Sequence, residues 1–264
     1  MYNSFHYRMG VVMKRNFMHS KIFAVVSLVF GLTGLLLISH HIISYNNVLV
    51  PYMDELIANK VITNNVNGAT FLCYFTNQSN IFVDVYLILF ALGVLGNKKL
   101  YDFTHNEKLR GAVTLYICIT GIIYFTVLLP FSQGGFPMEK SIWFSNVVNY
   151  WNHLITPVVF TALWFKPVAE DRKPLPVVKS ALLSLIYPLC YFIFSVVRGG
   201  IVDFYPYPFL SGKQMWEMLF KGQEYDALLG ALLLVAAFVL LCGIFFGVGC
   251  TLFAIHNKIV KKKA

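Results

Sequence analysis

The second apolar run of the chain carries a block of polar residues that could do chemistry. It begins Phe71-Leu-Cys-Tyr-Phe and continues Thr76-Asn77-Gln78-Ser79-Asn80, with Asp84 four residues further on. On a helix, Thr76, Asn80 and Asp84 recur at i, i+4 and i+8 and therefore share one face. Polar side chains are costly in hydrocarbon, so we expect this face to look into a helix bundle.

A second polar row lies in the fourth apolar run. Asn146, Asn149 and His153 are spaced i, i+3 and i+7, and Pro157 follows them. At a rise of about 1.5 Å per residue, Thr76 and His153 lie roughly 8 and 10 Å below the starts of their helices. Both helices start on the outer side, and a hydroxyl and an imidazole at one depth could act as nucleophile and general base.

The same residues allow three interpretations. In a hydrolase, Asn80 or Asn149 could donate a hydrogen bond to the developing oxyanion, with Asp84 as a further supporting residue. In a channel or transporter, Asp84 and His153 could relay protons. In a structural protein, the amides and hydroxyls would only hold helices together.

The last outer loop contains the run Tyr205–Leu210, with two prolines and three aromatic residues. Proline fixes the backbone and removes donors, so we predict an extended segment here. We expect it to fold over the mouth of the bundle as a lid, with Tyr207 and Phe209 near the substrate. Arg198, at the outer end of the fifth run, could bind a carboxylate or place its charge at the membrane surface.

These residues must be positioned by membrane-spanning helices. Apolar residues make up 58% of the 264 residues and charged residues only 12%, which argues against an ordinary soluble enzyme. Six runs are long enough to cross a bilayer, at about 22–44, 71–95, 111–129, 146–165, 178–197 and 228–256. The runs lack the alternation of strands, so we predict an all-α, polytopic membrane protein whose residues 1–264 form one domain of six transmembrane helices.

The positive charges predict how the chain is oriented. Sixteen of the 21 Lys and Arg residues lie in the N-terminal tail, the second loop, the fourth loop and the C-terminal tail, all on one side of the predicted bundle. This bias predicts that both termini are cytoplasmic. The net charge of +9 therefore points to anionic membrane lipids as partners and not to nucleic acid.

The cysteines give no sign of a cofactor. None of the five has CxxC spacing, so we expect neither a zinc site nor a disulfide framework, and we predict no metal and no cofactor. We expect a multi-pass integral membrane protein, in the cell membrane of a bacterium or in the plasma membrane or endomembranes of a eukaryote. The oligomeric state is not indicated by the sequence.

Three short motifs resemble a known family. They are Phe75-Thr76 before the polar block, Asn149-x-x-x-His153 followed by Pro157, and Tyr207-Pro208-Phe209-Leu210 before the last run. In their order and in the six runs, the chain resembles the family of the androgen-induced-gene and androgen-dependent TFPI-regulating proteins, with their bacterial relatives. The resemblance implies a hydrolase for fatty acid esters of hydroxy fatty acids, with Thr76 as nucleophile and His153 as its base.

Overall fold

The computed structural model describes residues 18, 20–44, 68–128, 143–166 and 173–263, and every element assigned in these ranges is helical. The prediction of an all-α chain is therefore confirmed for these residues. The N-terminal tail and most of the predicted first and third loops lie outside them. The longer elements are α2 (Lys21–Ser44), α4 (Phe75–Val94), α5 (Lys98–Thr104), α6 (Glu107–Ile123), α8 (Trp143–Tyr150), α9 (Thr156–Trp164), α10 (Val177–Ser184), α11 (Ile186–Val202), α12 (Gly212–Leu219) and α13 (Ala227–Lys263).

Five helical segments of the described chain are long and apolar enough to cross a membrane. They are Lys21–Ile43, Phe75–Val94, Glu107–Val127, Val177–Val202 and Ala227–Lys261. Their outer surfaces keep large apolar side chains exposed, such as Leu36 on α2 and Leu228 and Leu240 on α13. Soluble surfaces avoid apolar patches of this extent, whereas lipid tails accept them. The chain is therefore a helical membrane protein.

The fourth predicted run is helical but irregular. It consists of α8, a π-helical turn η6 (Trp151–Ile155) and α9, and its polar residues keep it out of the set of five. The π turn ends just before Pro157, which has no N–H to donate to the carbonyl of His153 four residues earlier. The wider π turn accommodates this missing hydrogen bond. It also rotates the polar residues of η6 about the helix axis relative to those of α8.

Other predicted boundaries also differ from the structure: the third run begins at Glu107 instead of 111, and the last continues to Lys263 instead of 256. The second run was expected to be helical from residue 71, but a separate 3₁₀ helix, η3 (Gly68–Cys73), precedes α4. The fifth run is divided at Leu185 into α10 and α11, where Pro188 cannot donate to the carbonyl of Ser184.

The prediction that Tyr205–Leu210 is wholly extended is wrong. Residues Pro208–Leu210 form a 3₁₀ turn, η7, in which the Leu210 amide donates to the carbonyl of Tyr207 at 3.0 Å. Proline is tolerated at the first position of such a turn because that position needs no donor. The turn brings Leu210 into the interior, where it is 1% exposed.

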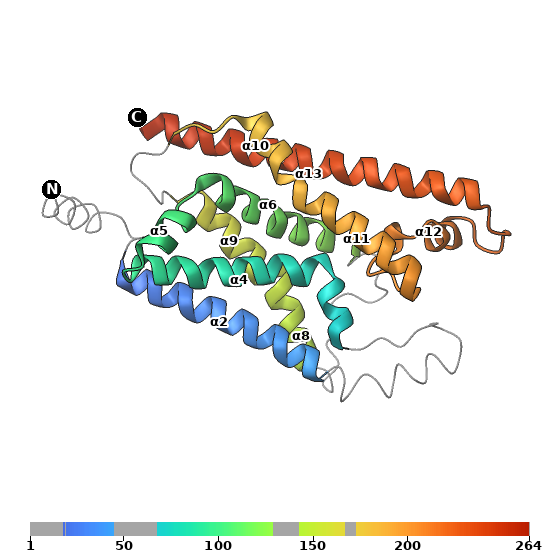
Figure 1. Cartoon of the computed structure of the whole chain (residues 1–264), viewed down its shortest axis with the longest axis horizontal. Coiled ribbons are helices and arrows are strands. Elements are labelled where there is room, and N and C mark those ends of the chain that lie inside the picture. The colour runs from blue at the N-terminus through green and yellow to red at the C-terminus, as the bar shows by residue number, and fades with distance from the viewer. Residues whose placement is uncertain (1–17, 19, 45–67, 129–142, 167–172, 264) are drawn as a thin grey trace, which may run out of the picture.

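The helices form a layered bundle (Figure 1). α2 packs on α4, α4 on α6 and α6 on α9, while α13 covers α10, α6 and α12. α2 begins and α13 ends at the same end of the bundle, where α5 also lies (Figure 1).

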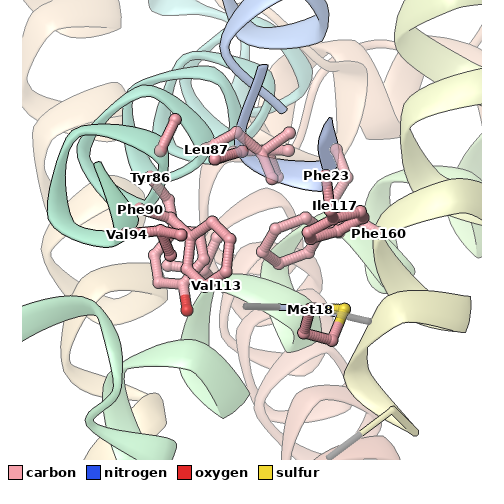
Figure 2. Packing of buried hydrophobic residues seen from close by; sticks show 12 residues of the cluster. Met18, Phe23, Tyr86, Leu87, Phe90, Val94, Val113, Ile117 and Phe160 are labelled. Carbon is pink, nitrogen blue, oxygen red and sulfur yellow. The ribbon is translucent and has the colours of Figure 1, made fainter. Parts of the chain in front are cut away.

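The buried apolar side chains fall into two clusters. The first joins α2, α4, α6 and α9, with Phe23, Phe90, Ile117 and Phe160 packed together (Figure 2). The second joins the start of α4 to α6, α11, α13 and the loop before α12. Between them they fix the height and rotation of α4, which carries Thr76.

Candidate functional site

The first turn of α4 is held by two tyrosine hydroxyls. The first amides of a helix have no partner within the helix. Here the Phe75 N–H donates to the Tyr191 hydroxyl at 3.1 Å, and the Thr76 N–H donates to the Tyr207 hydroxyl at 3.3 Å. Tyr191 in turn donates to the carbonyl of Cys73 at 2.9 Å. A span and a distant loop thus cap the helix at the predicted nucleophile.

The Thr76 side chain also contacts Tyr207. The Thr76 Oγ1 and Tyr207 hydroxyl oxygens are 3.2 Å apart. Burial raises the pKa of the Tyr207 phenol, and the hydrogen bonds from Thr76 oppose this only in part. The phenol is therefore protonated at neutral pH and has one proton to donate next to the Thr76 hydroxyl. Its ring stacks on that of Phe209, with centroids 5.0 Å apart.

Thr76 lies in the wall of an apolar cavity that opens to the outside, with about 680 Å³ of space free of protein atoms when its open mouth is included. The wall is formed by the start of α4, by α6, α11 and α13, and by the loop with η7. Its polar groups are few, mainly the hydroxyls of Thr76, Thr120, Tyr191 and Tyr207. The other lining residues are Phe75, Ile119, Ile123, Leu185, Pro188, Leu189, Phe192, Phe209, Leu210, Phe238, Leu241, Cys242 and Phe245. A mostly apolar cavity with a few convergent polar groups is the usual form of a site for an apolar small molecule.

Behind Thr76, polar side chains connect three helical segments. The Ser79 hydroxyl lies 2.7 Å from the Thr120 hydroxyl on α6. The Asn80 amide donates to the Thr76 carbonyl at 2.8 Å and to the Asn152 carbonyl on η6 at 3.0 Å. The Asn152 amide donates to Asn77 Oδ1 at 3.3 Å. Much of the predicted polar block is thus engaged in contacts between helices.

His153 has a different neighbourhood. Its ring stacks on that of Tyr124, with centroids 3.8 Å apart, and its Nδ1 lies 3.0 Å from the carbonyl of Asn149. Because a carbonyl can only accept, Nδ1 carries the proton and Nε2 is the basic nitrogen. The Asn149 amide donates to the Tyr124 hydroxyl at 2.7 Å. Asn149 and Tyr124 therefore fix the ring and the tautomer of His153.

The structure does not bring Thr76 and His153 into contact. Among the residues that the structure describes, the Thr76 hydroxyl meets Tyr207, and His153 does not line the cavity. The two residues are linked indirectly, because Asn80 bonds both the Thr76 carbonyl and the carbonyl of Asn152, the neighbour of His153.

The other predicted site residues are dispersed. Asp84 is 1% exposed and is packed against Gly34 of α2, away from the residues that line the cavity. Arg198 lies over the ring of Phe204, 5.8 Å from its centroid, and is also outside the cavity wall. Tyr207 and Phe209 are both in the wall. The side chain of Asn146 is outside the described residues.

Sequence reasoning missed the roles of Tyr191 and Tyr124. Tyr187 and Tyr191 are one turn apart in the fifth run, and Tyr187 donates to Gln78 at 2.6 Å while Tyr191 caps α4. Hydroxyls repeated at i and i+4 in an apolar run are a signal for a polar partner on a neighbouring helix. Tyr124 has no such signal, because its role depends on the rotation of η6.

No family model, no curated protein and no solved structure matches the chain. Fold and site together define a helical membrane protein with an apolar, hydroxyl-bearing cavity inside its bundle.

Proposed function

We propose that this protein is an integral membrane hydrolase that cleaves a lipid ester in the cavity beneath Tyr207. The observation that carries the proposal is the Thr76 hydroxyl in the wall of that apolar cavity, at the first turn of α4. An acyl chain would occupy the apolar part, with its ester beside Thr76. Substrates like fatty acid esters of hydroxy fatty acids have such apolar chains on both sides of the ester.

The reaction would follow nucleophilic ester cleavage. Thr76 Oγ1 would give up its proton to a base, attack the ester carbonyl carbon and form an acyl-threonine as the ester C–O bond breaks. The departing alkoxide takes that proton, and water then releases the acid and restores the Thr76 hydroxyl. The helix N-terminus at Thr76 and the Tyr207 phenol would favour the negative charge that develops on the carbonyl oxygen.

His153 is the proposed base. The Asn149 carbonyl leaves Nε2 as the nitrogen that can accept a proton. Thr76 and His153 do not touch in this structure, where their side chains contact Tyr207 and Tyr124. In ligand-free enzymes, catalytic hydrogen bonds are often formed only in the substrate complex. Loss of the Tyr207 contact on substrate binding would free the Thr76 hydroxyl for His153.

A covalent probe tests the nucleophile. A fluorophosphonate should label the full-length protein in detergent or nanodiscs, and mass spectrometry should locate the adduct on Thr76. Thr76→Ala should lose the label, while Thr120→Ala, which removes another hydroxyl of the same wall, should keep it. An adduct on any other residue, or equal labelling of Thr76→Ala, would contradict the proposal.

We further propose that the chain crosses the membrane six times with both termini in the cytoplasm. The additional crossing is the α8–η6–α9 segment, the fourth in chain order, whose Asn152 side chain donates to Asn77 of α4. Lys98 and Lys99 of α5 lie at the end of the bundle where α2 begins and α13 ends, which supports one positively charged cytoplasmic face (Figure 1).

Cysteine labelling from outside the cell tests this orientation. In a variant without the five native cysteines, Lys98→Cys and Lys173→Cys should react with an impermeant maleimide only after the membrane is permeabilised. Lys221→Cys, in the loop after α12, should react in intact cells. Labelling of Lys98→Cys or Lys173→Cys from outside would overturn the orientation.

A further inference from the structure

Five buried side-chain oxygens in the middle of the bundle have no hydrogen-bond partner among the described residues. They are Asn80 Oδ1, Asp84 Oδ1 and Oδ2, Asn152 Oδ1 and Thr156 Oγ1. The four residues are at most 3% exposed, and none lines the apolar cavity. A buried acceptor without a partner is costly, and such groups call for an explanation.

Contacts between α4 and the η6–α9 segment place these residues in two facing rows. Asn80 donates to the carbonyl of Asn152, and further along both helices the Tyr86 and Phe160 rings are 5.4 Å apart. The two segments therefore run in the same direction. Asp84 follows Asn80 by one turn, and Thr156 follows Asn152 by one turn, so the second pair lies about 6 Å deeper than the first.

Helix α2 closes the third side of this group. A Cβ atom added to Gly34 would overlap the Asp84 carboxyl, so the carboxyl lies directly against the α2 backbone. α2 also meets the fourth segment, since the Phe30 and Trp151 rings are 4.7 Å apart. Asp84 thus lies where α4 packs on α2, and α2 also contacts the fourth segment.

The chemistry of these groups is one-sided. Four of the five oxygens, those of the carboxylate and the two amides, only accept hydrogen bonds, and the single proton of the Thr156 hydroxyl cannot satisfy all of them. No described Lys, Arg or His is an ion-pair partner of Asp84, and the basic residues of α2, Lys21, His40 and His41, lie near its ends. An ionised carboxylate alone in hydrocarbon costs several kcal/mol or more. A cation would neutralise the carboxylate and serve all of these oxygens together.

We propose that Asp84, Asn80, Asn152 and Thr156 form a binding site for a monovalent alkali cation. Hard cations prefer oxygen ligands, and these are carboxylate, amide and hydroxyl oxygens. One carboxylate is balanced by one positive charge, whereas a divalent ion would leave a net charge in a buried site. This site departs from our prediction of no metal, which was based on the spacing of the cysteines and so concerned cysteine-based sites. The ion would join α2, α4 and α9 and stabilise the bundle.

Thermal unfolding of the full-length protein in detergent tests the site. At equal ionic strength, Na⁺ should raise the Tm above its value in choline with a saturable dose dependence, by about 5–10 °C at a hundredfold excess over Kd. The same Tm measurements in Li⁺ and in K⁺ show which of the three ions the site binds most tightly. Asp84→Asn should abolish the ion-dependent shift, and Thr156→Val should move its half-saturation to higher concentration. The matched control, Asp102→Asn on the exposed side of α5, should keep the full shift.

Radioactive Na⁺ binding in a scintillation proximity assay gives a readout that does not depend on unfolding. Wild type should bind saturably, and Thr156→Val should bind more weakly even if Asp84→Asn does not fold. Equal Tm values of wild type in Na⁺, Li⁺, K⁺ and choline, without saturable binding, would overturn the site and indicate a protonated Asp84. A full Na⁺ shift in folded Asp84→Asn would overturn it as well.

Discussion

Replacing Thr76 by alanine should lower lipid-ester turnover by about 10³-fold or more, with little loss of folded protein. The hydroxyl is the proposed nucleophile, and no other group of the cavity replaces it. The fold should survive because the Thr76 N–H, and not the Thr76 side chain, donates the backbone hydrogen bond to the Tyr207 hydroxyl that caps α4. The substitution removes one side-chain contact with Tyr207 and leaves the backbone hydrogen bond in place. Turnover in nanodiscs, measured beside size-exclusion profiles, checks both statements.

A short series of variants separates catalysis from packing. Thr76→Ser keeps the hydroxyl and should retain activity. His153→Gln removes the proposed base and should cost about 10²–10⁴-fold, while the double variant should be no worse than Thr76→Ala alone because the two act as a unit. Thr120→Ala is the control in the same wall and should change turnover little. Unchanged turnover in Thr76→Ala would contradict the hydrolase, whereas unchanged turnover in His153→Gln would contradict only the base.

The membrane-crossing runs were largely predictable because apolar length is a property of the sequence itself. The first run was expected at 22–44, and α2 spans Lys21–Ser44. The start of α4 was not predictable, since it depends on hydroxyls of Tyr191 and Tyr207, which lie more than a hundred residues away. The π turn before Pro157 and the break before Pro188 follow from proline chemistry, but only the structure shows their form.

The sequence predicted neither the depth nor the direction of the candidate site. The rise per residue gives a depth only where the start of the helix is known, but α4 begins at Phe75 instead of 71 and the fourth segment is already helical at Trp143. It does not give the rotation of each helix about its axis, which packing determines. In the structure, η6 directs Asn152 toward α4, while the His153 ring rests on Tyr124 of the neighbouring helix. The Thr76 hydroxyl instead contacts the hydroxyl of Tyr207, which lies in the loop between α11 and α12.

Packing also determines which glycines can be replaced by a larger residue without loss of stability. We expect the largest loss from a substitution at Gly34. Leucine there would force α2 away from the Asp84 carboxyl, which is buried. Overpacking commonly costs about 1–3 kcal/mol, and a four-carbon side chain where a Cβ alone already overlaps the Asp84 carboxyl should exceed this range. Gly34→Leu should therefore lower the Tm by more than about 10 °C or abolish the monodisperse peak.

The matched control is the same substitution on α13. A Cβ at Gly243 would meet no atom within 4 Å, so Gly243→Leu points into open space at the apolar outer surface. It should leave the Tm within about 2 °C of wild type, as exposed substitutions usually do. Both variants add the same side chain to a glycine of a helix that can cross the membrane, so helix propensity and hydrophobicity cancel in the comparison. Equal Tm values for the two variants would mean that α2 does not pack on Asp84, and the cation site enclosed by α2 would lose its third wall.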